Sequence, residues 1–327
     1  MKTGKVLVTG ASGFIGSAVV RQLLNRNVDV RCLVRTTSRR DRLEGLPIEF
    51  ATGDIRSVQQ VLEASSGCDR VIHVAGPSRW SDLGSPEVGP MILVGIENVL
   101  NAARATGVKR VVHVSSAAVL GPTNHEEPRD ERSSESAICP RKMRYAAAKR
   151  EAEKICRRYV GNGIEIVIVN PCEVFGPGDR DLVTAGNLLP LLRGRIRIVC
   201  RGGTSVAHVD DIGDSIVRAL DRGRSGERYF LGGDNISHRE LAIIAGMIIG
   251  QRSPVVTVPN FVVRGASWIA RRIGARFAIP QAAVPFVTAY WFLDAKKARS
   301  ELGATFRPAL KTLEETIRWL RETGQAS

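Results

Sequence analysis

Tyr145 and Lys149 are separated by three alanines, which is the spacing of two side chains that could share a proton. Alanine is the strongest helix former, and residues four apart lie on one face of a helix, one turn from each other. A free tyrosine ionises near pH ~10, and a neighbouring ammonium group lowers the pKa of the phenol. The pattern therefore predicts a proton-transfer pair with Tyr145 as the acid or base. The alternative is an ordinary solvent-exposed pair on a helix.

Three glycines form a second candidate site near the start of the chain. Gly10, Gly13 and Gly16 follow a short apolar run at residues 5–9 and precede apolar residues at helical spacing. This order predicts a buried parallel strand, a tight turn and a helix. Without Cβ atoms, the turn can approach a pyrophosphate, which the N–H groups at the helix N-terminus stabilise. A second apolar run at residues 28–34 completes a strand-helix-strand pattern, so we expect a dinucleotide site rather than merely a tight turn.

The elements that must position these residues alternate along the first half of the chain. Apolar runs separated by helical patterns lie near residues 4–9, 28–34, 47–51, 70–75, 109–114 and 164–169. This alternation predicts an α/β fold with a Rossmann-type, doubly wound parallel sheet. We expect residues 1–170 to form the dinucleotide-binding domain. We expect residues 171–327 to form mainly a smaller substrate-binding lobe, with some segments returning to the first domain.

Shorter elements are expected in the second half. A strand is predicted at residues 228–231 and helices at residues 239–249 and 313–322, the last of them amphipathic. Helices are also predicted at residues 88–105 and 144–160.

The glycine spacing, together with Ser116 and the Tyr145 and Lys149 pair, resembles the extended short-chain dehydrogenase/reductase family, also described as the NAD-dependent epimerase/dehydratase superfamily. Other stretches look like landmarks of that family, in the same order: residues 53–55, 73–76, 115–121, 171–177 and 208–211. Within the family, the chain looks most like the group of dihydroflavonol 4-reductases and hopanoid-associated epimerase-like proteins. The resemblance implies that Ser116 binds the substrate oxygen and that Tyr145 transfers its proton. It also implies that Lys149 holds the nicotinamide ribose and stabilises the phenolate.

The resemblance also implies the cofactor contacts. The turn that binds the pyrophosphate comprises Gly10, Ser12, Gly13, Phe14 and Ile15. Asp54 is expected to meet the adenine amino group, and Ile55 to pack against the adenine ring. Ala75 and Gly76 are expected on the nicotinamide side, where Pro171 shapes the pocket.

The residue that ends the second predicted strand bears on the choice of cofactor. An acidic residue there selects NAD by binding the ribose hydroxyls, but this chain has Arg35. Further arginines follow at positions 39, 40 and 42. Because a guanidinium group suits a 2′-phosphate in charge and geometry, we expect NADP(H), with NAD(H) as the alternative.

Three chemistries are known in the family, and the sequence favours reduction of a ketone or aldehyde. Dehydratases carry carboxylates where this chain has Ser116 followed by two alanines. Many sugar-nucleotide enzymes have an arginine at the position of Thr204. A nucleotide-sugar epimerase remains the alternative, and a non-catalytic dinucleotide sensor or assembly subunit is the second.

Composition limits the partners. The net charge of +14 comes mainly from arginines spread along the chain, with no basic helix carrying interleaved aromatics, so no nucleic-acid partner is expected. The six cysteines, at positions 32, 68, 139, 156, 172 and 200, show no paired or metal-type spacing. With an N-terminus that runs directly into the first strand, these features predict a cytoplasmic protein with reduced thiols.

Three further expectations concern partners and metals. By resemblance, the helices at residues 88–105 and 144–160 would pair with those of a second subunit in a homodimer. The segment 261–293 mixes bulky apolar residues with arginines; we expect it to cover an apolar substrate pocket, with peripheral membrane contact as the alternative. His113, His208 and Asp210 are scattered and expected to be structural, so no metal site is predicted.

Overall fold

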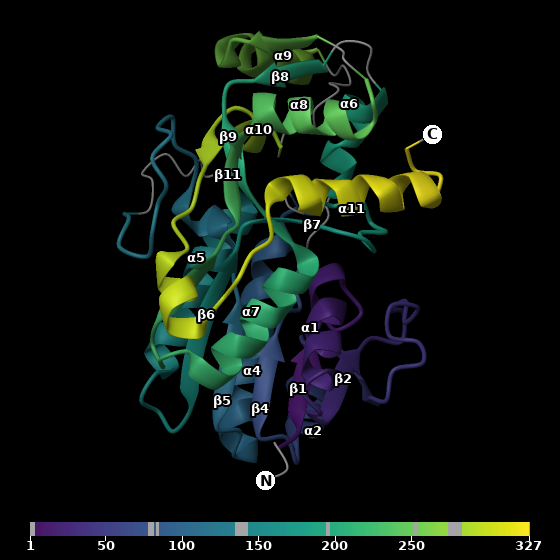
Figure 1. Ribbon diagram of the computed structural model, residues 1–327. Helices are drawn as coiled ribbons and strands as arrows, with labels where there is room; N and C mark the ends of the chain where they lie inside the picture. Colours follow the sequence, from purple (N-terminus) through teal and green to yellow (C-terminus); the bar gives the residue numbers. More distant parts are fainter. Residues whose placement is uncertain are drawn as a thin grey trace.

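The computed structural model describes residues 4–77, 82, 85–134, 143–193, 197–251, 254–273 and 283–326. Its centre is a seven-stranded parallel sheet in the order β10-β6-β5-β4-β1-β2-β3 (Figure 1). The strands are β1 (Val6–Thr9), β2 (Val30–Val34), β3 (Glu49–Thr52), β4 (Arg70–His73), β5 (Arg110–Val114), β6 (Glu165–Pro171) and β10 (Arg228–Leu231). This is the Rossmann order with one added strand, and the order reverses between β1 and β4. The predicted fold class is confirmed.

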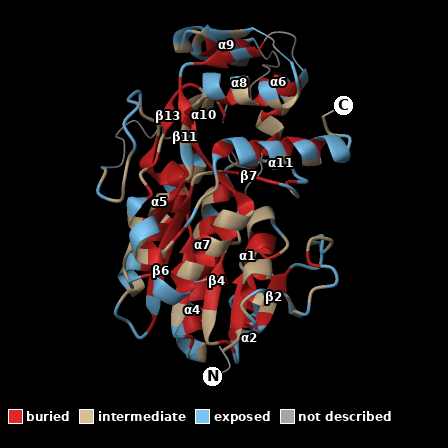
Figure 2. Cartoon of the chain, viewed as in Figure 1, coloured by how far each residue is buried: buried red, intermediate tan, exposed pale blue. Residues whose placement is uncertain are grey.

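Helices cover both faces of this sheet. One face carries α1 (Phe14–Leu24) and α7 (Val209–Arg222), and the other carries α2 (Val58–Ser65), α4 (Val88–Thr106) and α5 (Arg144–Tyr159). The inner strands are buried on both sides, which is why they are continuous apolar runs rather than alternating ones (Figure 2). Each face of the sheet has its own apolar core.

The second half of the chain builds a smaller lobe. A four-stranded sheet contains β7 (Glu173–Phe175), β9 (Gly203–His208), β11 (Asp234–Ser237) and β13 (Tyr290–Trp291). Strands β8 (Arg197–Cys200) and β12 (Val255–Val258) form a separate parallel pair. The helices are α6 (Leu189–Arg193), α8 (His238–Ile248), α9 (Asn260–Arg272), α10 (Val284–Val287) and α11 (Ala309–Glu322). Short helical turns lie at η1 (Ala117–Leu120), η2 (Ala185–Asn187) and η3 (Ala298–Leu302).

Helix α11 closes the lobe on the side of the large sheet (Figure 1). Its buried residues recur at helical spacing: Ala309, Thr312, Leu313, Thr316, Ile317 and Leu320. They join a core formed with α6, α8 and strands of the lobe. The amphipathic helix expected at residues 313–322 therefore exists and begins four residues earlier.

The chain crosses from lobe to sheet more than once. After β7 and β9 it returns through α7 and β10, and β10 pairs with β6 at the edge of the large sheet. The strand expected at residues 228–231 is present, as is the helix expected near residues 239–249. No helix in the described ranges is both long enough and apolar enough to span a bilayer.

Candidate active site

The glycine turn lies where the strand order reverses, and its backbone is closely packed. Gly10 has a left-handed backbone with φ of 72°, and a Cβ there would lie 2.6 Å from the backbone nitrogen of Ala75, just after β4. A Cβ on Gly16 would lie 2.1 Å from the carbonyl oxygen of Gly10. These two positions require glycine because the opposing atoms belong to the backbone. Gly13 is exposed, and its N–H donates to Gly10 O at 3.0 Å.

The N-terminus of α1 is open to a negatively charged ligand. Gly13 is its N-cap and offers no side chain to the first N–H groups, and the first turn contains no acidic residue. Ser12, Phe14 and Ile15 are partly exposed around it. The uncapped N–H groups and the helix dipole therefore suit the pyrophosphate of a dinucleotide.

Arg42 holds this turn in place, a role that the sequence did not indicate. Its Nη1 donates to Ser12 O at 3.0 Å, and its Nε donates to Gly178 O at 3.0 Å. Asp181 pairs with the same guanidinium group at 3.6 Å. The expected group of four arginines around a 2′-phosphate is therefore wrong for Arg42, which is bound to two backbone carbonyls, one of them 136 residues away in sequence.

The remaining arginines of that group also have different surroundings. Arg39 pairs with Asp41 at 3.2 Å, and the guanidinium group of Arg40 lies 4.9 Å from the centre of the Phe50 ring. Arg35 directly follows β2 and is exposed. Its charge is close enough to lower the pKa of Asp54, although Arg56 lowers it more through a 2.7 Å ion pair. Arg35 and Asp54 thus lie close enough for their charges to interact.

Helix α4 positions Ile55, the residue expected to pack against the adenine ring. Asn98 Nδ2 donates to Ile55 O at 2.9 Å. A Cβ on Gly95 would lie 2.7 Å from Ile55 Cδ1, so the absence of a side chain at Gly95 makes room for Ile55. Sequence reasoning missed both Asn98 and Gly95.

Ser116, Tyr145 and Lys149 meet at the carboxyl edge of β5. Ser116 caps the η1 turn by accepting a hydrogen bond from Ala118 N at 3.2 Å, and its side chain is hydrogen-bonded with the phenol of Tyr145. Lys149 Nζ lies 5.9 Å from the centre of the Tyr145 ring and donates to Val114 O at 2.8 Å. A Cβ on Gly76 would come within 3.8 Å of the same Nζ atom. The three side chains therefore adjoin the nicotinamide side of the predicted cofactor site.

The pKa of Tyr145 departs from the sequence-based expectation. Burial raises it to about 12, and the hydrogen bond with Ser116 only partly opposes this effect. Burial also lowers the pKa of Lys149 to about 8, against the charge of Glu153. The expectation that the Lys149 ammonium group lowers the pKa of Tyr145 is therefore wrong, because the cost of burying the phenolate exceeds the attraction of the ammonium group. At neutral pH, Tyr145 keeps its proton and Lys149 keeps its positive charge. Tyr145 can therefore act as a proton donor next to a cation.

Glu153 lies beneath these residues, two turns after Tyr145 on α5, and was not identified from the sequence. Its side chain is fully buried. Oε1 accepts hydrogen bonds from Ser115 Oγ and Asn170 Nδ2, both at 2.6 Å. Asn170 Nδ2 also donates to the backbone carbonyl of Ser116 at 3.1 Å. Glu153 therefore positions the segment that carries Ser116.

His73 and His113 lie side by side on β4 and β5 under the same site. Their rings stack with centres 5.5 Å apart. His73 Nδ1 lies 2.7 Å from Thr9 Oγ1, which accepts from Ala75 N at 3.4 Å. Burial lowers the pKa of His73 to about 3 and that of His113 well below its ordinary value, and the charge of Lys149 adds to both effects. Both rings are neutral at pH 7, and His73 supports the loop after β4 through Thr9.

Pro171 is buried at the end of β6.

A cluster of apolar side chains lies beside Tyr145, and the partly buried Tyr145 packs against it. We call this cluster the apolar wall. Its described residues are Ala118, Met143, Ala146, Phe286 and Trp291. The rings of Phe286 and Trp291 stack 4.7 Å apart. Phe286 and Trp291 of the segment expected to cover a substrate pocket therefore lie in one cluster with Tyr145, whereas α9 from the same segment does not belong to it.

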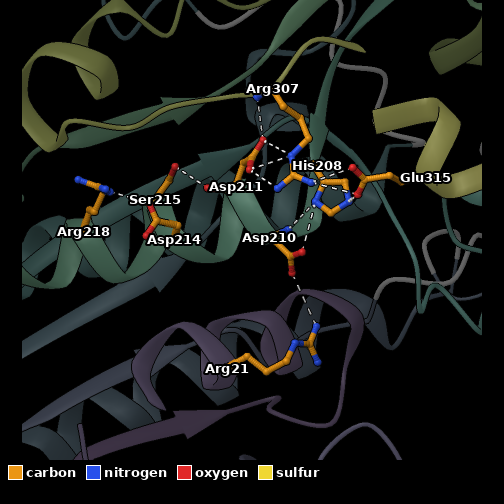
Figure 3. A network of polar contacts seen from close by, with 9 residues as sticks. All are labelled: Arg21, His208, Asp210, Asp211, Asp214, Ser215, Arg218, Arg307 and Glu315. Atoms are coloured by element: carbon orange, nitrogen blue, oxygen red, sulfur yellow. Dashed lines mark hydrogen bonds and ion pairs between the residues drawn. The ribbon is translucent and has the colours of Figure 1, made fainter. Parts of the chain in front are cut away.

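His208 and Asp210 join a structural network at the start of α7 (Figure 3). Asp210 N donates to His208 Nδ1 at 3.1 Å, and His208 Nε2 lies 3.1 Å from Glu315 on α11. Arg307 links Glu315 to Asp211 with contacts of 3.1 and 2.8 Å. Burial and Arg307 lower the pKa of His208, so the ring is neutral at pH 7. The network fastens α11 to α7.

The fold and the site define an oxidoreductase that binds a nicotinamide dinucleotide. Residues 6–232 match the sequence model of the NAD dependent epimerase/dehydratase family. The chain belongs to this family and is an NAD(P)-dependent enzyme of the extended short-chain dehydrogenase/reductase type.

Similar proteins include both reductases and nucleotide-sugar enzymes. A putative dihydroflavonol 4-reductase from Synechocystis is 29% identical over 97% of this chain and 94% of its own length. Sterol demethylase protein B from Methylococcus capsulatus is 28% identical over 97% and 98% of the two chains. The crystal structure of gox2253 is 31% identical and superposes with a TM-score of 0.85 over 99% of this chain and 100% of that chain. The structure of DesIV, a dTDP-glucose 4,6-dehydratase from Streptomyces venezuelae with NAD bound, has a TM-score of 0.78 at 27% identity over 97% of both chains.

Proposed function

We propose that this protein uses NADPH to reduce a ketone or aldehyde group on a bulky apolar molecule. The observation that carries the proposal is the apolar wall of Met143, Phe286 and Trp291 next to the Ser116, Tyr145 and Lys149 cluster. Among the described side chains of this wall, the indole N–H of Trp291 is the one polar group. Most of these side chains are buried in the structure, and apolar side chains that line a binding site favour rings or long apolar chains held by few polar contacts.

The proton chemistry follows from the side chains present. When bound, NADPH supplies the hydride that adds to the carbonyl carbon of the substrate. In this proposal Ser116 Oγ hydrogen-bonds the carbonyl oxygen, and Tyr145 Oη, protonated at neutral pH, donates the proton that this oxygen requires. The Lys149 ammonium stabilises the phenolate left behind, because an opposite charge nearby favours the ionised form.

The preference for NADP rests on Arg35. This exposed guanidinium group follows β2, where an NAD-binding relative would carry an acid. The nearby carboxylate of Asp54 is paired with Arg56, so it opposes a bound 2′-phosphate less than a free carboxylate would. Charge and bidentate geometry therefore favour the phosphorylated cofactor.

The names of several relatives agree with an apolar substrate. They include the putative dihydroflavonol 4-reductase and sterol demethylase protein B described above. A third is the 4-hydroxy-2-methyl-3-oxo-4-farnesyl-3,4-dihydroquinoline-1-oxide ketoreductase of Stigmatella aurantiaca, 29% identical over 98% of this chain and 97% of its own length. We infer a substrate of similar apolar character and assign none of these named compounds to this chain.

The test is to incubate the purified protein with NADPH and a panel of aromatic, alicyclic and long-chain ketones, and in parallel with UDP- and dTDP-sugars. The expected result is oxidation of NADPH with an apolar ketone and no epimerised sugar. Interconversion of a nucleotide sugar without net use of NADPH would instead establish epimerisation. The buried Thr204, in place of an arginine that could bind a diphosphate, argues against that outcome.

A further inference from the structure

Helix α9 presents its apolar side to solvent. Phe261, Ile269 and Ile273 are 75%, 52% and 72% exposed, and Trp268 is 51% exposed. The side of α9 that faces the lobe carries only Val263, Ser267 and Ala270 as buried residues. A surface helix of a globular protein normally buries its larger apolar residues, so the orientation of α9 is the reverse of the usual one.

Other apolar side chains gather at the same end of the molecule. Ile198 on β8 is 65% exposed and pairs in register with Val256 on β12, which is also exposed. Met247, near the end of α8, is exposed as well. Figure 1 shows α9, β8 and α8 at the end of the lobe opposite the N-terminus. We call the exposed apolar side of α9 the outer face of the lobe; its members are Phe261, Val262, Trp268, Ile269 and Ile273.

The sequence around this face is strongly basic. Residues 182–209 and 241–293, which contain β8, β12 and α9, hold nine arginines and no lysine, aspartate or glutamate. Arg264 and Arg272 are exposed on α9 itself, and the guanidinium group of Arg272 lies 4.6 Å from the centre of the Trp268 ring. Exposed aromatic and aliphatic side chains interspersed with arginines match the interfacial region of an anionic bilayer.

We propose that the outer face of the lobe docks on the surface of a bilayer containing anionic lipid. Helix α9 lies along the membrane plane, with Phe261, Trp268 and Ile269 at the boundary between headgroups and acyl chains. A second copy of this chain is a poorer occupant. A two-fold contact through α9 would bring the exposed Arg264 and Arg272 of two copies together, and like charges repel across an interface. This proposal does not depend on the reaction that the enzyme performs.

Vesicle co-sedimentation of the full chain tests the proposal. Vesicles of phosphatidylcholine mixed with phosphatidylglycerol are expected to pellet the protein, and added salt is expected to weaken binding. Pure phosphatidylcholine vesicles are expected to bind at least about tenfold more weakly, because the electrostatic contribution of the arginines is lost.

Matched variants locate the contact. Ile269→Ser is expected to weaken vesicle binding about tenfold. Val58→Ser alters a residue of similar exposure, 54%, on α2 and is expected to bind like the wild type. Arg272→Gln gives a second, milder change that tests the charge. Far-UV circular dichroism verifies that each variant is folded.

Three results would overturn the proposal. One is the absence of pelleting with anionic vesicles, and another is equal binding by Ile269→Ser and Val58→Ser. The third is a concentration-dependent dimer in sedimentation velocity that Ile269→Ser abolishes, since the outer face would then be an interface between copies. A blue shift of tryptophan fluorescence with anionic vesicles that is lost in Trp268→Ser would support the docking.

Discussion

Ser115, the residue before Ser116, donates a 2.6 Å hydrogen bond to the buried carboxyl group of Glu153. Through the same oxygen, Glu153 binds Asn170, which holds the carbonyl of Ser116. Burial lowers the pKa of Lys149 to about 8, and the charge of Glu153 opposes this fall. One side chain therefore influences both the position of the serine and the charge of the lysine.

Glu153→Gln should move the high-pH decline of activity to lower pH. The change retains the side chain's shape but removes the charge that keeps Lys149 protonated. It also deprives Arg157 and Arg228 of a charged partner at 3.3 and 3.6 Å, so we expect the free energy of unfolding to drop by about 1 to 3 kcal/mol. The measurement is the pH profile of kcat/KM together with urea unfolding. Glu151→Gln, on the same helix but half exposed, is the control. An unchanged profile would show that Glu153 acts only in stability.

Tyr145→Phe should reduce turnover by at least about 100-fold, because it removes the proton donor. The affinity for NADPH should remain close to that of the wild type, since the phenol lies on the substrate side of Lys149. Stopped-flow turnover and fluorescence titration with NADPH separate the two effects. Turnover that survives the loss of the hydroxyl would exclude Tyr145 as the acid.

Arg35→Asp should weaken NADPH binding about 10- to 100-fold, the range for losing a charged hydrogen bond, and should affect NADH much less. Calorimetric titration of both cofactors provides the comparison. Arg318→Asp makes the same charge change at an exposed position of α11 and controls for the altered net charge. Equal losses for the two cofactors would contradict the proposed contact with the 2′-phosphate.

Gly16→Ala should destabilise the protein by about 1 to 3 kcal/mol, because its Cβ would meet the backbone oxygen of Gly10 at 2.1 Å. The distortion should also weaken NADPH binding. Gly89→Ala, in α4 with no neighbouring atom within 4 Å, should be neutral or stabilising by up to about 1 kcal/mol. Thermal and urea unfolding of both variants test the contrast; similar stabilities would mean that the turn adapts readily.

Acid should destabilise the protein through its buried histidines. The pKa of His113 lies well below its ordinary value of 6.5, so the unfolded chain binds a proton that the folded chain does not as pH falls below 6.5. Stability from this ring is therefore present above pH 6.5 and is lost below it. Between pH 7 and pH 5, wild type should lose about 2 kcal/mol more than His113→Gln. Urea unfolding at both pH values measures this difference, with exposed His125→Gln as the control. A variant that loses as much stability as the wild type would refute it.

The large sheet could be predicted because its signals are local. Each buried parallel strand is a short apolar run, and the turn after β1 requires glycine at fixed positions. The proximity of Tyr145 and Lys149 likewise follows from helical spacing alone. Their roles in the reaction stay predictions until they are measured.

The remaining features depend on contacts between distant parts of the sequence. Arg42 was assigned to a phosphate because it follows Arg35, yet its partners include a carbonyl at Gly178. Glu153 gains its role from Ser115, 38 residues away, and from Asn170 on another strand. The pKa of Tyr145 depends on burial, which spacing cannot indicate. The sequence showed that residues 261–293 mix bulky apolar residues with arginines, but tertiary packing decides that the apolar side of α9 faces outward.

The attachment of α11 has a consequence for how the protein is made. The large sheet gains its last strand at Leu231, whereas the core of the lobe still needs Leu313, Ile317 and Leu320. During translation, the sheet can therefore assemble while the apolar interior of the lobe is still uncovered. Until α11 leaves the ribosome, the apolar side chains of α6 and α8 that it covers would stay exposed to solvent.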